Sequence, residues 1–267
     1  MKYLIQTIKY LKSNLLLLPS LAIAVMCFAV IVDYTAAETV IDSYGAGYIT
    51  DSFTDWFKLF IPFNSKSWIT ILLSIAAYVL LVLNVAFVHS MVDKHVRFGS
   101  KSFRSVMSSF TINFVYGLIT MLVIAAACLV MALLLAVVMK TFAMPGAYIF
   151  IIGAVICAVL AALFIFIGAH FFLWLPCAEI TGYKMSEALY CSYAQARTVR
   201  WTNTVAIALP LALSVVTVSL FGAFLGTVAA IISGAVCFGC SYMLIVVASY
   251  MAYADVENIE REDLRKY

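Results

Sequence analysis

Residues 204–250 read TVAIALPLALSVVTVSLFGAFLGTVAAIISGAVCFGCSYMLIVVASY, without a single charged side chain. A membrane-spanning helix needs roughly 20 mostly apolar residues, so this stretch is far too long for one span. Within it, Gly222, Gly226 and Thr227 suggest a turn. The stretch therefore predicts two transmembrane helices, Thr204–Leu225 and Val228–Tyr250, joined by a tight hairpin.

Four further apolar segments meet the same length requirement. They are Leu15–Val32, Trp68–His89, Thr111–Met139 and Ala147–Leu175. The whole chain is 66% apolar and 11% charged, whereas a soluble domain is about half apolar and a quarter charged. Its mean hydropathy of +1.09 agrees. We therefore expect one all-α integral membrane domain over residues 1–267, with six transmembrane helices, an outer loop at 33–67 and a tail at 254–267.

The lysines and arginines predict the orientation. Thirteen of the sixteen lie in four segments on one side of the predicted membrane, and Lys58, Lys66 and Lys140 lie on the other. Cytoplasmic loops retain an excess of Lys and Arg, so the basic side is predicted to be cytoplasmic. Both termini are then cytoplasmic, and we expect a multi-pass protein of a bacterial-type inner membrane.

Short amphipathic helices are predicted on the cytoplasmic side before spans one, three and five. They cover Met1–Ser13, Lys101–Phe110 and Ser186–Arg197. In the first, Leu4 and Ile8 fall on one face and lysines fall toward the other, as in a helix that lies in the headgroup layer.

Enzyme signatures are missing from the sequence. It contains no Walker loop, no Gly-rich dinucleotide turn, no HExxH and no GxSxG. Cys237 and Cys240 form a CxxC inside an apolar span, where small packing residues are a better interpretation than a redox or metal pair. We expect free thiols, no metal, no cofactor and no nucleic-acid partner, because topology and anionic lipid account for the basic residues.

A small set of polar side chains gathers in the cytoplasmic halves of spans two and four. These residues predict a polar opening for an amphiphile, with nearby basic side chains attracting an anionic headgroup. The candidate ligand-binding residues are Asn84, His89, His170, Glu179, Lys94, Arg97 and Lys184. The alternative is a set of separate interhelical hydrogen bonds with no ligand.

Residues 175–203 read LPCAEITGYKMSEALYCSYAQARTVRWTN. Through Pro176, Glu187, Ala188, Ser192 and Trp201, this layout resembles the membrane domain of bacterial glycerophosphoryl diester phosphodiesterases and the related six-helix inner-membrane proteins. The resemblance implies a membrane module with a connection to lipid. The phosphodiesterase chemistry of those proteins resides in a separate soluble domain, so no catalytic residue carries over to this chain.

Three functions follow in order of preference. The first is a non-enzymatic protein that binds or helps to move a lipid or other amphiphile. The second is the membrane subunit of a transporter with a separate ATPase, which would dock on loops 94–110 and 179–203. The third is an intramembrane enzyme that uses His89, His170 and Glu179.

Overall fold

The computed structural model describes residues 2–34, 53–61, 63–99, 112–142, 147–181 and 183–260, and its regular elements there are all helices. In chain order these are α1 (Lys2–Ser13), the 3-10 turn η1 (Leu15–Leu17), α2 (Leu18–Ile31), α4 (Phe53–Phe60), α5 (Trp68–Phe98), α7 (Ile112–Phe142), α8 (Ala147–His170), α9 (Trp174–Ile180), α10 (Met185–Leu225) and α11 (Thr227–Val256). Among the described residues, five helices are long and apolar enough to cross a membrane, or up to six if the bent N-terminal pair counts as one span. The chain is therefore a multi-pass, all-helical membrane protein.

The predicted hairpin near Gly226 is confirmed. Gly226 alone separates α10 from α11, and its φ of 82° with ψ of 178° is a backbone conformation that only glycine adopts readily. Its N–H donates to the Gly222 carbonyl, and its own carbonyl accepts from Ala230. The two helices pack along each other, and the hydroxyls of Ser214 and Ser241 meet at 2.7 Å between them.

Several predicted span ends differ from the helix ends in the structure, among them that of α11, which continues past Tyr250 to Val256. Helix α5 continues past His89 to Phe98, where Gly99 ends it in the left-handed conformation. Helix α8 stops at His170, before the predicted end at Leu175, and α9 follows after one tight turn. The physical reason lies in Pro176: it has no N–H to donate back into the preceding turn, and it fits only the first turn of a new helix.

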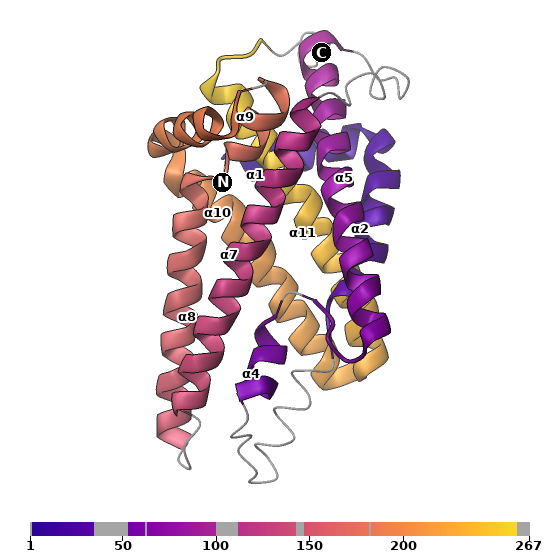
Figure 1. Ribbon diagram of the computed structural model, residues 1–267. Coiled ribbons are helices and arrows are strands. Elements are labelled where there is room, and N and C mark those ends of the chain that lie inside the picture. Colours follow the sequence, from indigo (N-terminus) through magenta and orange to yellow (C-terminus); the bar gives the residue numbers. More distant parts are fainter. Residues whose placement is uncertain are drawn as a thin grey trace.

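The predicted interfacial helices have three different outcomes. Helix α1 forms as predicted and lies at 92° to the helical segment that follows it. The second predicted helix, 101–110, lies outside the described residues. The third is not a separate helix, because α10 runs without a break from Met185 through the fifth apolar segment. No glycine or proline interrupts it before Pro210. Figure 1 shows its first turns crossing the top of the bundle before the helix descends.

The main core lies at the end of the bundle where α1, α9 and the C-terminal parts of α5 and α11 meet (Figure 1). Its largest fully buried side chains include Tyr3, Leu173 and Tyr250. An ion pair of 2.8 Å from Lys2 to Asp255 joins the first helix to the last at this end. At the opposite end, α4 packs against α7 and buries Trp56 beside Met139.

Candidate functional site

His89 and Glu179 form a buried pair inside the bundle. The Nδ1 atom of His89, on α5, lies 2.6 Å from Oε2 of Glu179, on α9. The His89 side chain is 0% exposed and that of Glu179 is 8% exposed. A buried acid is costly unless it is paired and hydrogen-bonded. The pair therefore connects the end of the fourth apolar segment to the second.

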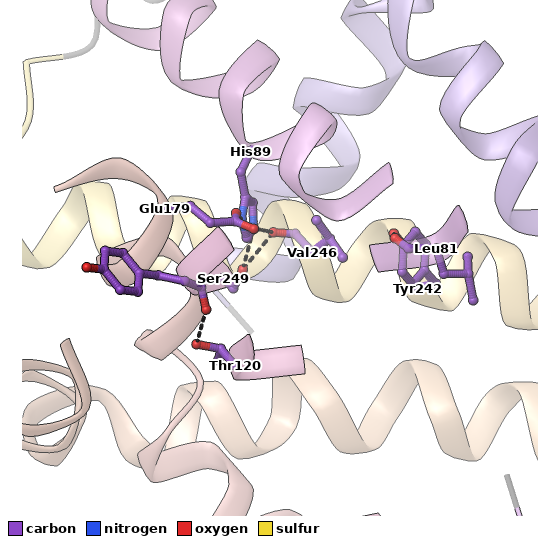
Figure 2. A network of polar contacts seen from close by, with 8 residues as sticks. Leu81, His89, Thr120, Glu179, Tyr242, Val246 and Ser249 are labelled. Carbon is purple, nitrogen blue, oxygen red and sulfur yellow. Dashed lines mark hydrogen bonds and ion pairs between the residues drawn. The ribbon is translucent and has the colours of Figure 1, made fainter. Parts of the chain in front are cut away.

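The other ring nitrogen of His89 contacts α11 (Figure 2). Its Nε2 atom lies 3.1 Å from the carbonyl oxygen of Val246 and 3.1 Å from the hydroxyl of Ser249. A carbonyl oxygen only accepts, so Nε2 carries a hydrogen and donates it. The Ser249 hydroxyl donates to the same carbonyl at 2.7 Å. With Nε2 protonated, the short contact between Nδ1 and Glu179 requires one more proton, carried by either partner.

A glycine on α7 makes room for the carboxylate. A Cβ atom at Gly117 would lie 2.7 Å from Cγ of Glu179 and would overlap one carboxylate oxygen. Only a residue without a side chain lets Glu179 rest directly on the backbone of α7. Thr120, one turn along α7, is fully buried, and its hydroxyl donates to the carbonyl of Tyr116. The pair thus lies where α5, α7, α9 and α11 converge.

Two of the predicted polar residues make separate contacts. Asn84 is buried, and its amide donates to the Ser20 carbonyl at 3.0 Å, which joins α5 to α2. His170 bonds the carbonyl of Phe166 in its own helix at 3.0 Å, and its ring stacks on Tyr193. These are the contacts expected of interhelical and intrahelical hydrogen bonds. The structure therefore joins His89 to Glu179 but places Asn84 and His170 in other contacts.

The predicted basic residues lie nearer the end of the bundle. The Nε atom of Arg97 lies 2.6 Å from Asp93, which also accepts a 2.9 Å hydrogen bond from the Tyr250 hydroxyl. Lys94 is half-buried on α5. Lys184 is exposed at the start of α10, where its backbone N–H donates to Glu187.

Sequence reasoning missed three participants, Gly117, Val246 and Ser249. Val246 contributes only its backbone carbonyl, which no sequence pattern reveals. Ser249 is a polar residue inside an apolar helix, and Gly117 is a small residue among larger ones. Both are visible signals, but neither identifies its partner.

The connection Glu179–His89–Ser249 uses the same ring nitrogens as a hydrolase triad, with the acid on Nδ1 and the serine on Nε2. In a triad, however, Nε2 accepts the serine proton. Here Nε2 donates, and the Ser249 proton points to the Val246 carbonyl. His89 and Ser249 are 0% and 5% exposed, so the bundle encloses both side chains. The contacts of this arrangement join α5, α9 and α11.

Metal binding finds no support in the described part of the chain, where no three His, Cys, Asp or Glu side chains converge. All seven cysteines are free thiols. No family model, curated protein or solved structure matches this sequence or fold. The resemblance to the phosphodiesterase membrane domain therefore stays a prediction.

Proposed function

We propose that this chain is a non-enzymatic bacterial-type inner-membrane protein that binds or helps to move a lipid or other amphiphile. In this proposal six helices cross the bilayer, and both termini lie in the cytoplasm. Helix α2 is the first of the six, and α1 lies along the cytoplasmic surface before it. The uneven distribution of lysines and arginines supports that orientation. The resemblance to a membrane module with a lipid connection agrees with it.

The observation that carries the proposal is the geometry of α1. Its buried face, with Tyr3, Leu4 and Tyr10, packs on the end of the bundle. Its opposite side exposes Ile5 and Ile8, 52% and 54% respectively. The same exposed side carries Lys2, Lys9 and Lys12. A helix at right angles to the segment that follows it, docked on one side and exposing isoleucines and lysines on the other, fits the plane of the headgroup layer. It would hold the cytoplasmic mouth of the bundle at the depth where lipid headgroups lie.

The charges inside the bundle argue against ion transport. His89 and Glu179 neutralise each other, as do Arg97 and Asp93. An ion path needs polar groups that face a water-filled passage. These groups instead bond helices together, and that arrangement favours an uncharged or amphiphilic ligand.

A transporter subunit with a separate ATPase is the second candidate. Tyr190 and Trp201, in the predicted docking segment 179–203, are 76% and 65% exposed. Exposed aromatic side chains mark protein interfaces, although they also anchor helices at the membrane surface.

Native mass spectrometry of the protein in gentle detergent tests both functions. We expect lipid to remain bound, and to be reduced when Ile5 and Ile8 are changed to Asp but not when the exposed Ser186 of α10 is changed to Asp. A co-purifying ATPase without lipid would favour the second candidate. A preparation with neither would contradict the proposal.

A further inference from the structure

An apolar groove lies in the elbow between α1 and α2. It has a volume of 260 Å³ and is lined by Ile8 and Leu11 of α1, Leu18 and Leu21 of α2, and Cys240 and Leu244 of α11. Ile8 and Leu18 are 54% and 53% exposed, and Cys240 is exposed too, so the groove is open on one side. An apolar cavity of about 150 Å³ stays dry and binds benzene, so this groove can hold part of an acyl chain. We call it the elbow groove.

One polar residue lines the elbow groove. Asn14, at the bend between α1 and η1, donates through Nδ2 to the carbonyl of Tyr10 and to the hydroxyl of Ser13. Its Oδ1 accepts no hydrogen bond from the described residues and is open to solvent at the groove. An acceptor in an apolar site favours a ligand that supplies a donor there, such as a hydroxyl group.

Two lysine side chains lie on α1 near the elbow groove. Lys9 and Lys12 are exposed on α1, and Lys12 lies one helical turn after Ile8 and next to Leu11. Neither lysine forms an ion pair or hydrogen bond with the described residues, whereas Lys2 is engaged by Asp255. Lysines at the membrane surface attract anionic headgroups.

We infer that the elbow groove binds an anionic glycerolipid of the surrounding membrane. One acyl chain lies between α1, α2 and α11, the phosphate lies near Lys12, and a headgroup hydroxyl donates to Asn14. This inference rests on the proposed function and adds to it the lipid class and the residues that select it. The site differs from the polar pair, because neither His89 nor Glu179 lines the groove.

The test uses photoreactive phosphatidylglycerol, with the reactive group in its acyl chain, and the full chain in vesicles of phosphatidylcholine. We expect labelling of the peptides that hold Leu18 and Leu244. Cys240→Trp fills the groove and should abolish that labelling. The matched control Ile232→Trp, on an exposed position of the same helix, should leave it unchanged. If Cys240→Trp fails to fold, Leu18→Trp fills the groove from the other wall.

Headgroup selection is tested with Lys12→Gln, which should lower the preference for phosphatidylglycerol over phosphatidylcholine about fivefold, the effect of one lysine near an anionic surface. Lys140→Gln, an exposed lysine in the last turn of α7, is the control. Equal labelling in Cys240→Trp and the unaltered protein would refute the groove while leaving the proposed function intact. No labelling at any position in the unaltered protein would refute both, and an unchanged preference in Lys12→Gln would refute the selection for anionic lipid.

Discussion

Replacing Glu179 should reveal how much the buried pair contributes to stability. Glu179→Ala removes the partner of His89 Nδ1 and leaves that nitrogen buried without a hydrogen bond. Removing one partner of a buried pair costs about 3–5 kcal/mol. Glu179→Gln keeps an N–H that can donate to Nδ1 while Nε2 still donates to Val246, so it should cost less than about 1.5 kcal/mol.

Gly117 gives an independent test of the same geometry. Gly117→Ala places a methyl group against the Glu179 side chain and should cost about 1–3 kcal/mol by overpacking. In the Glu179→Ala background the methyl group meets no carboxylate, so most of that cost should disappear. Gly168→Ala, where a Cβ meets nothing within 4 Å, is the control and should change stability by less than about 1 kcal/mol.

The assay is equilibrium unfolding in bicelles, measured by steric trapping, with helix content checked by circular dichroism. The double-mutant cycle between positions 117 and 179 isolates their coupling. Two results would refute the reasoning. One is equal destabilisation by Glu179→Ala and Glu179→Gln. The other is an additive cycle, in which Gly117→Ala costs the same in both backgrounds.

Three other outcomes are expected. Cysteine labelling in intact cells, in a background without native cysteines, should reach position 143 from outside and position 258 only after the membrane is opened; outside labelling of position 258 would contradict an even number of spans. Tyr3→Ala should destabilise the protein by about 3–5 kcal/mol, because the Tyr3 side chain is 1% exposed. Lys2→Gln should cost less than about 1 kcal/mol, because the Lys2–Asp255 ion pair is exposed. Equal unfolding curves for the two variants would contradict this contrast. Asn84→Leu should lower stability by about 1–3 kcal/mol through the lost bond to α2 and leave lipid occupancy per folded protein unchanged; lost occupancy at normal stability would instead support a ligand site at Asn84.

Most of the helical architecture could be predicted from the sequence, because each span is a local property. About 20 apolar residues define a membrane helix wherever they occur. The hairpin could be predicted because Gly222, Gly226 and Thr227 are the turn signals in a long apolar stretch, and the break between the helices falls at Gly226. Helix α8 ends at His170, although the apolar segment able to cross a membrane continues through α9 to Ile180, because Pro176 interrupts the helical hydrogen bonds and not the apolar composition. Apolar composition predicts which residues lie in lipid. It does not predict at which residue the backbone hydrogen bonds of a helix end.

The candidate site was less predictable. His89 and Glu179 could be placed at a similar depth, because His89 ends the second predicted span and Glu179 follows shortly after the fourth. Their contact depends on how four helices rotate about their axes, and membrane sequences with apolar residues on every side carry little information about rotation. Gly117 makes room for the Glu179 side chain, and this role can be seen only once α9 is placed against α7. For the same reason the free acceptor of Asn14 could not be connected to residues on α11.

Helix α11 links the buried pair to the elbow groove. Met243 and Leu244 line the groove, and the carbonyl of Val246 receives the hydrogen of His89 less than one turn further along. On the far side of the pair, Tyr250 bonds Asp93. The α11 wall of the groove is held in place by polar contacts from α5. Polar contacts also hold the α1 wall, through the Lys2–Asp255 ion pair and the 2.9 Å contact of Tyr10 with His95. Hydrogen bonds to buried groups fix a helix in rotation as well as in position, whereas apolar contacts tolerate sliding. The walls on α1 and α11 are therefore both fixed to the same end of the bundle, which favours a groove whose shape is set before a lipid binds.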